Sequence, residues 1–387
     1  MKTLRSGRNR RKWIYVLLLM GLLGLSGCGS PSSASVEMSS QTELVKTGSM
    51  ELQYAENFAV DYYEDGYKML TTFPDSKQYL LVPEGQPVPR GLDEDVSILQ
   101  EPLQNIYLVA SGVMDMFASV DAVDQIRFSG QKQENWYIQT AKDAMAAGDM
   151  IYAGKYSKPD YELLVSEGCD LAIENRMITH SPEVVEMLQS FDIPVMIEYS
   201  SYEQHPLGKV EWVKFFGALT GKEAEAEEAF AEQTEILEKV ESGEKTGKTI
   251  AFFYVTSNGL IQVRQSTDYI PKLIELAGGR YIFEDLEDSG SGRSTLNMQV
   301  EDFYAGAKDA DILIYNSSID GGVTTLDELI GKCNILKDFK AVQEGQVYCT
   351  TNDMYQQSMA IGYLLQDMHT VLTDDDTAKL RYLFLLQ

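Results

Sequence analysis

Apolar and polar positions alternate with two different periods along most of the chain. Ile106 to Ala110 form a compact apolar run of strand length, Ser111 can cap the segment that follows, and apolar residues from Met114 to Val120 recur at helical spacing. A strand that leads into a capped helix is the first unit of an α/β fold.

The same order continues towards residue 204. Helices are predicted for Asp160 to Glu167 and Ser181 to Gln189, and strands for Leu171 to Ile173 and Val195 to Ile197. Residues 51–100 show short strands and turns that Pro and Gly interrupt. We therefore predict an N-terminal α/β lobe over residues 51–204.

A helical region runs from Pro206 to Ser242, with an interruption near Gly221. Its second part, Lys222 to Val240, is rich in Glu and Ala and contains neither Gly nor Pro, a composition that strongly favours a helix. Residues 205–243 are predicted to connect two lobes.

A second α/β series follows, and it predicts a C-terminal lobe over residues 244–387. Its expected strands are Ile250 to Val255 and Ile312 to Tyr315, and its expected helices are Tyr269 to Ala277, Val300 to Ala307 and Tyr355 to about Leu372. The predicted fold class is α/β, with two three-layer α/β lobes joined by a single long helix and a ligand cleft between the lobes.

The N-terminus has the organisation of a targeting segment. A basic head precedes an apolar run from Trp13 to Leu25, which is shorter than the roughly 20 residues of a membrane-spanning helix. The run ends in Leu25-Ser26-Gly27-Cys28, which resembles the lipobox of bacterial lipoproteins. The resemblance implies a signal peptide over residues 1–27, a lipid on Cys28 and a location on the extracellular face of the cell membrane; an ordinary secretory signal is the alternative.

Residues 28–50 are predicted as the lipidated cysteine and a flexible tether, because they are rich in Ser, Thr and Gly and lack apolar periodicity.

The formal net charge of the 387-residue chain is −27, so a nucleic acid partner is not expected. Cys169, Cys333 and Cys349 form no C-x-x-C pair, and a bridge between Cys333 and Cys349 remains open. The three histidines lie far apart in sequence, which disfavours a bare metal site.

Short motifs in both halves of the chain resemble one family. They are Pro159-Asp160-Tyr161-Glu162, Cys169 to Ile173, Ile193-Pro194-Val195, Leu276 to Gly279, Val300 to Phe303 and Ala310 to Ile314. In this order they resemble the helical-backbone solute-binding proteins of ABC importers, which carry ferric siderophores, haem or cobalamin. The sequence departs from the family pattern at Asp160, Tyr161 and Cys169, where Asn, Leu and Pro are usual.

The resemblance implies the partners of the chain: an ABC permease with its ATPase subunits, and a small chelate as ligand. It also implies that Glu162 and Glu301, one on each lobe, pair with arginines of the permease. The alternative for both is an ordinary solvated helix glutamate. The chain is expected to act as a monomer, without a resident cofactor.

Loops after strand ends are expected to line the cleft, because backbone N–H groups and helix N-termini point there. The candidate ligand-binding residues are Ser111, Trp136, Tyr152, Lys155, Tyr156, Asn175, Arg176, His180 and Tyr202 in the first lobe, and Arg264, Tyr269, Arg293, Asn316 and Tyr355 in the second. Aromatic rings can stack on a planar ligand, arginines can offset the charge of a ferric chelate, and His180 is the candidate axial ligand for a haem or corrin metal.

The predicted function is capture of a metal chelate, with a ferric siderophore first, and its delivery to the permease. Haem or cobamide binding by the same architecture is the alternative. An extracellular hydrolase on an α/β scaffold is the alternative from another class, but no G-x-S-x-G elbow or nucleophilic grouping is present in the sequence. The chain is therefore predicted not to be an enzyme.

Overall fold

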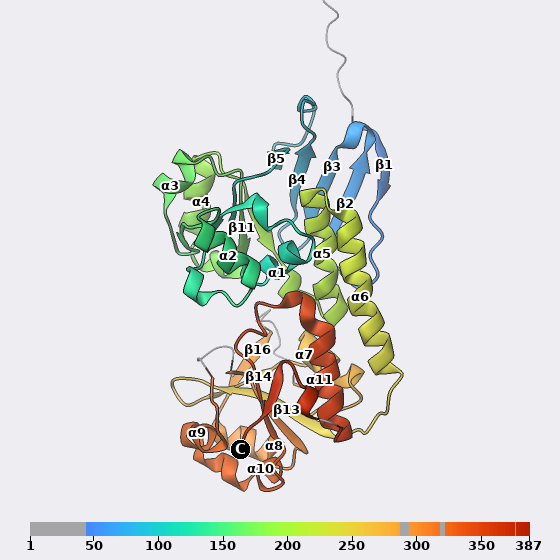
Figure 1. Ribbon diagram of the computed structural model, residues 1–387, viewed down its shortest axis with the longest axis vertical. Helices are drawn as coiled ribbons and strands as arrows, with labels where there is room; N and C mark the ends of the chain where they lie inside the picture. The colour runs from blue at the N-terminus through green and yellow to red at the C-terminus, as the bar shows by residue number, and fades with distance from the viewer. Residues whose placement is uncertain (1–43, 287–293, 318–321, 376) are drawn as a thin grey trace, which may run out of the picture. The chain divides into compact units, whose positions relative to one another are not determined.

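The computed structural model describes residues 44–286, 294–317, 322–375 and 377–387. The predicted signal peptide, Cys28, most of the tether and Arg293 lie outside the described residues. The described residues form the predicted α/β fold, with two three-layer lobes that follow one another along the chain (Figure 1).

A five-stranded sheet precedes the α/β units of the first lobe. Its strands are β1 (Lys46–Ser49), β2 (Phe58–Tyr63), β3 (Lys68–Thr72), β4 (Lys77–Val82) and β5 (Val96–Gln100), in that spatial order. All neighbours are antiparallel except β4 and β5. The predicted tether is therefore too long at its C-terminal end: β1 pairs with β2 although every residue of β1 is exposed, which is why it shows no apolar alternation.

The central sheet of the first lobe is fully parallel, in the order β12-β11-β6-β7-β8. Its strands are β6 (Ile106–Leu108), β7 (Ile126–Ser129), β8 (Ile151–Tyr152), β11 (Leu171–Asn175) and β12 (Val195–Glu198), and a small hairpin of β9 (Gly154–Lys155) and β10 (Lys158–Pro159) follows β8. Successive side chains of these strands point to opposite faces of the sheet and belong to two different cores. The helices α1 (Val113–Ser119) and α2 (Gln139–Ala147) cover one face, and α3 (Tyr161–Ser166) and α4 (Pro182–Ser190) cover the other.

Two adjacent helices form the predicted connection. α5 (Pro206–Thr220) is buried at every position except its last, and α6 (Glu223–Glu241) packs along it (Figure 1). Gly221 separates them in the left-handed region at φ 70°, a conformation that glycine adopts without steric cost. The buried residues of α6 recur every three or four positions, at Ala226, Phe230, Gln233, Leu237 and Val240. The long helix that leads into the second lobe is thus α6.

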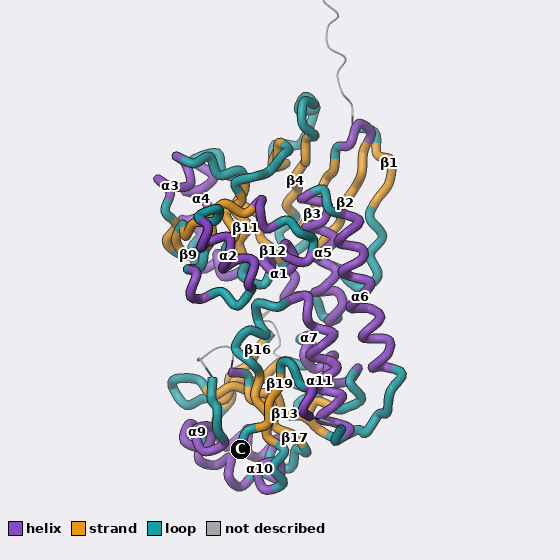
Figure 2. Tube along the Cα trace, in the orientation of Figure 1, coloured by secondary structure: helices purple, strands orange, loops and turns teal. Residues whose placement is uncertain are grey.

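The sheet of the second lobe is mixed, in the order β16-β14-β13-β17-β18-β19, with β15 paired to β13. Its strands are β13 (Thr249–Val255), β14 (Ile261–Arg264), β15 (Arg280–Tyr281), β16 (Thr295–Met298), β17 (Ile312–Tyr315), β18 (Val347–Thr350) and β19 (Leu383–Leu385). Figure 2 shows these strands between two helical layers: α7 (Tyr269–Leu276) and α11 (Ile361–Thr373) on one face, α8 (Val300–Ala307), α9 (Leu326–Lys332) and α10 (Lys340–Gln343) on the other.

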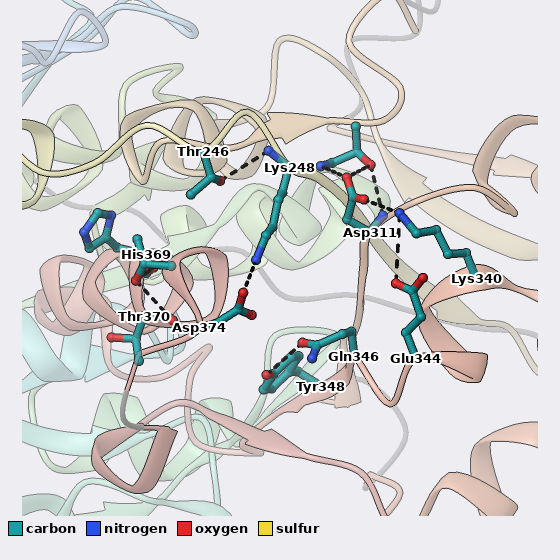
Figure 3. Close-up of polar contacts among 12 residues, drawn as sticks. Thr246, Lys248, Asp311, Lys340, Glu344, Gln346, Tyr348, His369, Thr370 and Asp374 are labelled. Atoms are coloured by element: carbon teal, nitrogen blue, oxygen red, sulfur yellow. Dashed lines mark hydrogen bonds and ion pairs between the residues drawn. The ribbon is translucent and has the colours of Figure 1, made fainter.

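An aspartate fixes the start of the first strand of the α/β units in each lobe. Asp311 precedes β17 and accepts hydrogen bonds from Thr249 N (2.7 Å) and Thr249 Oγ1 (2.8 Å) at the start of β13, while Lys340 Nζ lies 2.6 Å from its other oxygen (Figure 3). Asp170 precedes β11 and accepts from the backbone N–H groups of Gln104 and Asn105, both at 2.9 Å, before β6. Both aspartates belong to the family-like motifs of the sequence.

Cys169, Cys333 and Cys349 form no disulfide in the part of the chain that the structure describes. The bridge between Cys333 and Cys349 that the sequence left open is therefore not formed in this structure.

Candidate ligand-binding site

A cavity of about 490 Å³ lies where three strands of the first lobe end and a segment of the second lobe approaches them. It falls in the size range of small-molecule sites in proteins. Its lining residues are Ala110, Ser111, Gly112, Asn175, Arg176, Met177, Thr179, His180, Glu198, Ser200, Ser201, Tyr202, Lys209, Tyr355 and Ser358.

Parallel strand topology explains why these residues meet. β6, β11 and β12 are parallel neighbours, so the segments after Leu108, Asn175 and Glu198 leave the sheet at the same edge. The turn after β11 is fixed locally, because the Asn175 side chain accepts a hydrogen bond from Met177 N at 2.8 Å.

Gly112 allows the second lobe to approach. A Cβ atom at this position would lie 2.8 Å from Ser358 Oγ and 3.6 Å from the Tyr355 carbonyl oxygen. A larger residue would therefore require the Ser358 side chain to move.

Charged groups lie at the rim and in the depth of the cavity. The Arg176 guanidinium lies over the Tyr202 ring, 4.6 Å from its centre, and the Lys209 ammonium lies 4.7 Å from the centre of the Tyr269 ring. Glu198 is buried and accepts hydrogen bonds from Ser200 N (2.9 Å) and Ser200 Oγ (2.6 Å). Burial raises the pKa of Glu198 despite these hydrogen bonds and the nearby Lys209 charge.

Hydrogen bonds join the lobes beside the cavity. Gln356 of the second lobe accepts from Tyr137 N at 2.7 Å and donates to the Asn135 carbonyl at 2.8 Å. Asp115 in α1 accepts from Met359 N at 2.7 Å, and burial raises the pKa of this carboxyl to about 6. The wall of the cavity that comes from the second lobe is thus held by specific contacts.

Six of the predicted ligand-binding residues line the cavity together: Ser111, Asn175, Arg176, His180, Tyr202 and Tyr355. The structure places the others elsewhere. Tyr152, Lys155 and Tyr156 lie on and beside the hairpin that follows β8, and they are not in the lining. Arg293 lies outside the described residues.

Four predicted residues are held inside the lobes. Trp136 is 1% exposed in the core, where its Nε1 donates to Ser129 Oγ at 3.1 Å. Tyr269 and Asn316 are buried, and Arg264 forms an ion pair with Asp268 at 3.4 Å. A position after a strand end did not distinguish a side chain that lines the cavity from one that packs beneath it.

Sequence reasoning missed Glu198 and Lys209 in the lining. Lys209 had a signal: it belongs to Pro206-Leu207-Gly208-Lys209-Val210, the apolar start of α5, where a charged residue is unusual. Glu198 had a weaker one, because it ends a predicted strand at the edge that carries the site.

Glu162 and Glu301 occupy equivalent places. Each lies exposed in the first turn of a helix, α3 or α8, and each helix packs on the face of its lobe away from α5 and α6. Neither glutamate forms a hydrogen bond or ion pair within the described residues.

The described residues contain no group of three or more His, Cys, Asp or Glu side chains that would hold a bare metal ion. In the same part of the chain, every helix is too short or too polar to cross a membrane.

The chain belongs to the periplasmic binding protein family, whose model matches residues 109–354. This match confirms the family resemblance predicted from the motifs. Members of the family bind solutes, so the chain is a solute-binding protein and not an enzyme.

The chain is similar to a lipoprotein in sequence and to two transport-related binding proteins in fold. The uncharacterized lipoprotein MJ0878 of Methanocaldococcus jannaschii is 24% identical over 396 residues, which cover 93% of this chain and 92% of that protein. The periplasmic haem-binding protein HutB of Vibrio cholerae is similar in structure, with a TM-score of 0.55, 14% identity and coverage of 69% of this chain and 98% of its own. A protein of the ABC-type Fe³⁺-hydroxamate transport system of Saccharomonospora viridis has a TM-score of 0.53 at 16% identity, with 70% of this chain and 93% of its own covered.

Proposed function

We propose that this protein captures a metal chelate, with a ferric siderophore first, in the cavity lined by Arg176, Tyr202 and Tyr355, and delivers it to an ABC permease. The observation that carries the proposal is the meeting of two exposed tyrosine rings and a guanidinium in one cavity of about 490 Å³. Rings of this kind stack on chelating groups, and the guanidinium offsets the negative charge of many ferric chelates. The similarity to a Fe³⁺-hydroxamate transport protein supports the same class of ligand.

Haem binding is the second candidate, because His180 lies in the lining together with Tyr202 and Tyr355. A neutral imidazole is a common axial ligand of haem iron, and it also suits the cobalt of a cobamide. The similarity to a haem-binding protein supports this candidate.

A binding screen separates these ligands. Purified protein is titrated with a ferric trihydroxamate, haemin and cobalamin, and intrinsic Trp and Tyr fluorescence and ligand absorbance are recorded. Saturable binding of the trihydroxamate is expected, with loss of affinity in Tyr202→Ala and unchanged affinity in Tyr152→Ala, an exposed tyrosine outside the cavity. A Soret shift with haemin that His180→Ala abolishes would favour haem instead. Binding of none of the three would contradict the proposal.

We further propose that Glu162 and Glu301 dock the protein on the permease. Two exposed carboxylates, one on each lobe, suit two guanidinium groups in charge-assisted hydrogen bonds. The double variant Glu162→Ala/Glu301→Ala should bind ligand normally and fail to support uptake. The matched control is Glu186→Ala/Glu344→Ala, which removes one exposed glutamate from each lobe. Equal uptake by the two double variants would rule out this docking.

Lipidation of Cys28 and a location on the extracellular face of the cell membrane complete the proposal. The motif Leu25-Ser26-Gly27-Cys28 supports it, and so does the lipoprotein relative. Cys28→Ala should release the protein from the membrane fraction, which radiolabelled fatty acid and fractionation would measure. Membrane retention of this variant would contradict an anchor at Cys28.

A further inference from the structure

Lys209 has the features of a residue that binds an anionic group. It belongs to α5, lines the cavity and is only 9% exposed. Its ammonium carries three hydrogen-bond donors, yet within the described residues it forms neither a hydrogen bond nor an ion pair, and its close neighbour is the Tyr269 ring at 4.7 Å. Because this ammonium borders the cavity and has no acceptor among the described residues, a ligand that places an anionic acceptor there gains a charge-assisted hydrogen bond.

The carboxylates that face Lys209 are already engaged. Glu198 accepts two hydrogen bonds from Ser200, and Asp115 accepts one from Met359 N. Asp268 caps α7 through Ile270 N at 2.9 Å and pairs with Arg264 at 3.4 Å. These three carboxylates act on Lys209 only through space, because each already has a hydrogen-bond partner of its own. Among these described groups, the one that lacks a hydrogen-bond acceptor is the Lys209 ammonium.

The charge of the lining is opposite to that of the whole protein. The chain carries a net charge of −27, which repels anions at long range. In the cavity, Arg176 and Lys209 outnumber the one carboxylate of the lining, Glu198. Two cationic side chains in the lining of so acidic a protein favour a ligand with negative charge.

We infer that Lys209 sets the charge specificity of the cavity, and that the ligand carries a carboxylate or another anionic group that reaches the start of α5. This inference rests on the proposed function and, within its ligand class, ranks anionic chelates above neutral ones in affinity. Because Tyr269 belongs to α7 of the second lobe and Lys209 to α5, an anion bound here also contacts the place where the two lobes meet.

The test compares two chelates of one metal. Ferric citrate carries free negative charge, and ferric tris(acetohydroxamate) is neutral; binding of each is measured by fluorescence quenching. The variant Lys209→Met removes the charge at similar length, Lys209→Arg retains it, and the control Lys272→Met removes an exposed lysine that pairs with Glu275 outside the cavity. Melting curves establish that each variant is folded.

We expect wild-type protein to bind ferric citrate more tightly than the neutral chelate. Lys209→Met should weaken ferric citrate binding by about 30-fold or more and leave the neutral chelate within about 3-fold. Lys209→Arg should recover most of the affinity, and Lys272→Met should match wild type.

Equal effects of Lys209→Met on both chelates, or no effect on either, would overturn the inference and leave the proposed function standing. The same holds if wild-type protein binds the neutral chelate as tightly as ferric citrate, a result that needs no variant to fold. Binding of neither chelate by wild-type protein would overturn the proposed function together with this inference.

Discussion

The two lobes are built on the same plan, yet they contribute unequally to the cavity. Asp170-Leu171-Ala172-Ile173-Glu174-Asn175 of the first lobe corresponds to Asp311-Ile312-Leu313-Ile314-Tyr315-Asn316 of the second, and in both the aspartate fixes the neighbouring strand. The loops after β6, β11 and β12 supply most of the lining, whereas the described part of the second lobe supplies Tyr355 and Ser358.

Strand order alone therefore does not make a binding surface. Asn175 lies beside the cavity, but its counterpart Asn316 is buried at 3% exposure and lies outside the lining. The central sheet of the first lobe is purely parallel, whereas the sheet of the second lobe adds the antiparallel strands β14, β16 and β19.

Each lobe also holds a chain segment through a buried carboxylate, and this pair gives the largest expected effect. Glu211 in α5 accepts hydrogen bonds from the N–H groups of residues 53–55, and Asp367 in α11 accepts from those of residues 381–383. Glu211→Ala should lower the free energy of unfolding by about 4 kcal/mol and Asp367→Ala by about 3 kcal/mol. Glu211 costs more because Lys214, also buried, lies 3.5 Å from it.

Urea unfolding measures both values. Glu227→Ala is the control, since Glu227 also pairs with Lys214 but is 63% exposed, and it should cost less than about 1 kcal/mol. A larger loss of unfolding free energy in Asp367→Ala than in Glu211→Ala would contradict the expectation that the Glu211 carboxylate stabilises the protein more.

Glu174 is the next test, because its counterpart Tyr315 carries no carboxyl. Both carboxyl oxygens of Glu174 are buried without a hydrogen-bond partner in the described structure, and burial raises its pKa from 4.5 to about 8. Between these values the folded protein keeps a proton that the unfolded chain has lost, so stability falls as pH rises. Glu174→Gln should reduce this fall by about 2 kcal/mol between pH 6 and 7.5.

The readout is the unfolding free energy of wild type and Glu174→Gln over that pH range. Parallel pH profiles would show that Glu174 does not bind the extra proton. Glu183→Gln, an exposed glutamate in α4 of the same lobe, should leave the profile unchanged.

Replacing the aspartates that fix a neighbouring strand, Asp311 and Asp170, should have a smaller effect on the free energy of unfolding. Asp311 has Lys340 as an additional partner, and although burial alone would raise its pKa, the hydrogen bonds from Lys340 and Thr249 lower it. We expect losses of about 1.5 kcal/mol for Asp311→Ala and about 1 kcal/mol for Asp170→Ala, because both carboxylates are partly solvated. The loss for Asp311→Ala should shrink as pH falls, since a lowered pKa stabilises only the ionised form. Equal losses at every pH would contradict the role of Lys340.

The helices that carry the docking glutamates give the smallest effect. Asp160 caps α3 by accepting from Leu163 N at 3.1 Å, whereas Gln299 at the start of α8 forms no side-chain cap. Asp160→Ala should cost about 1 kcal/mol, and Gln299→Asp should gain a few tenths of a kcal/mol to about 1 kcal/mol. Thermal unfolding would detect both shifts, and destabilisation by Gln299→Asp would show that α8 does not need a cap.

Sequence periodicity predicted part of the parallel core but missed its strands β7 and β18. The expected strand Ile312 to Tyr315 and helix Val300 to Ala307 match β17 and α8, because buried parallel strands and amphipathic helices have strong apolar patterns. β1 was missed because it is exposed throughout, and β16 because its partly exposed residues show no alternation.

The cavity was predicted only in part. Asn175 and Arg176 were predicted correctly as lining residues, because they follow a strand whose carboxyl end lies at the cavity edge of a parallel sheet. Trp136 follows β7 in the same way but turns into the core, and Lys209 enters the lining from a helix. Tyr355 was assigned to the start of a helix that in fact begins at Ile361, and its irregular backbone is what brings it to the cavity.

The hydrogen bonds between Glu211 and residues 53–55 also determine how the folded protein resists a force applied at its N-terminal side. Tension would first unzip the exposed edge strand β1, one ladder bond after another. The force would then act on the backbone N–H groups of residues 53–55, which donate hydrogen bonds to Glu211 of the buried helix α5. These hydrogen bonds would have to break together. Mechanical load is thereby stopped a few residues into the fold, well before the strands that shape the cavity.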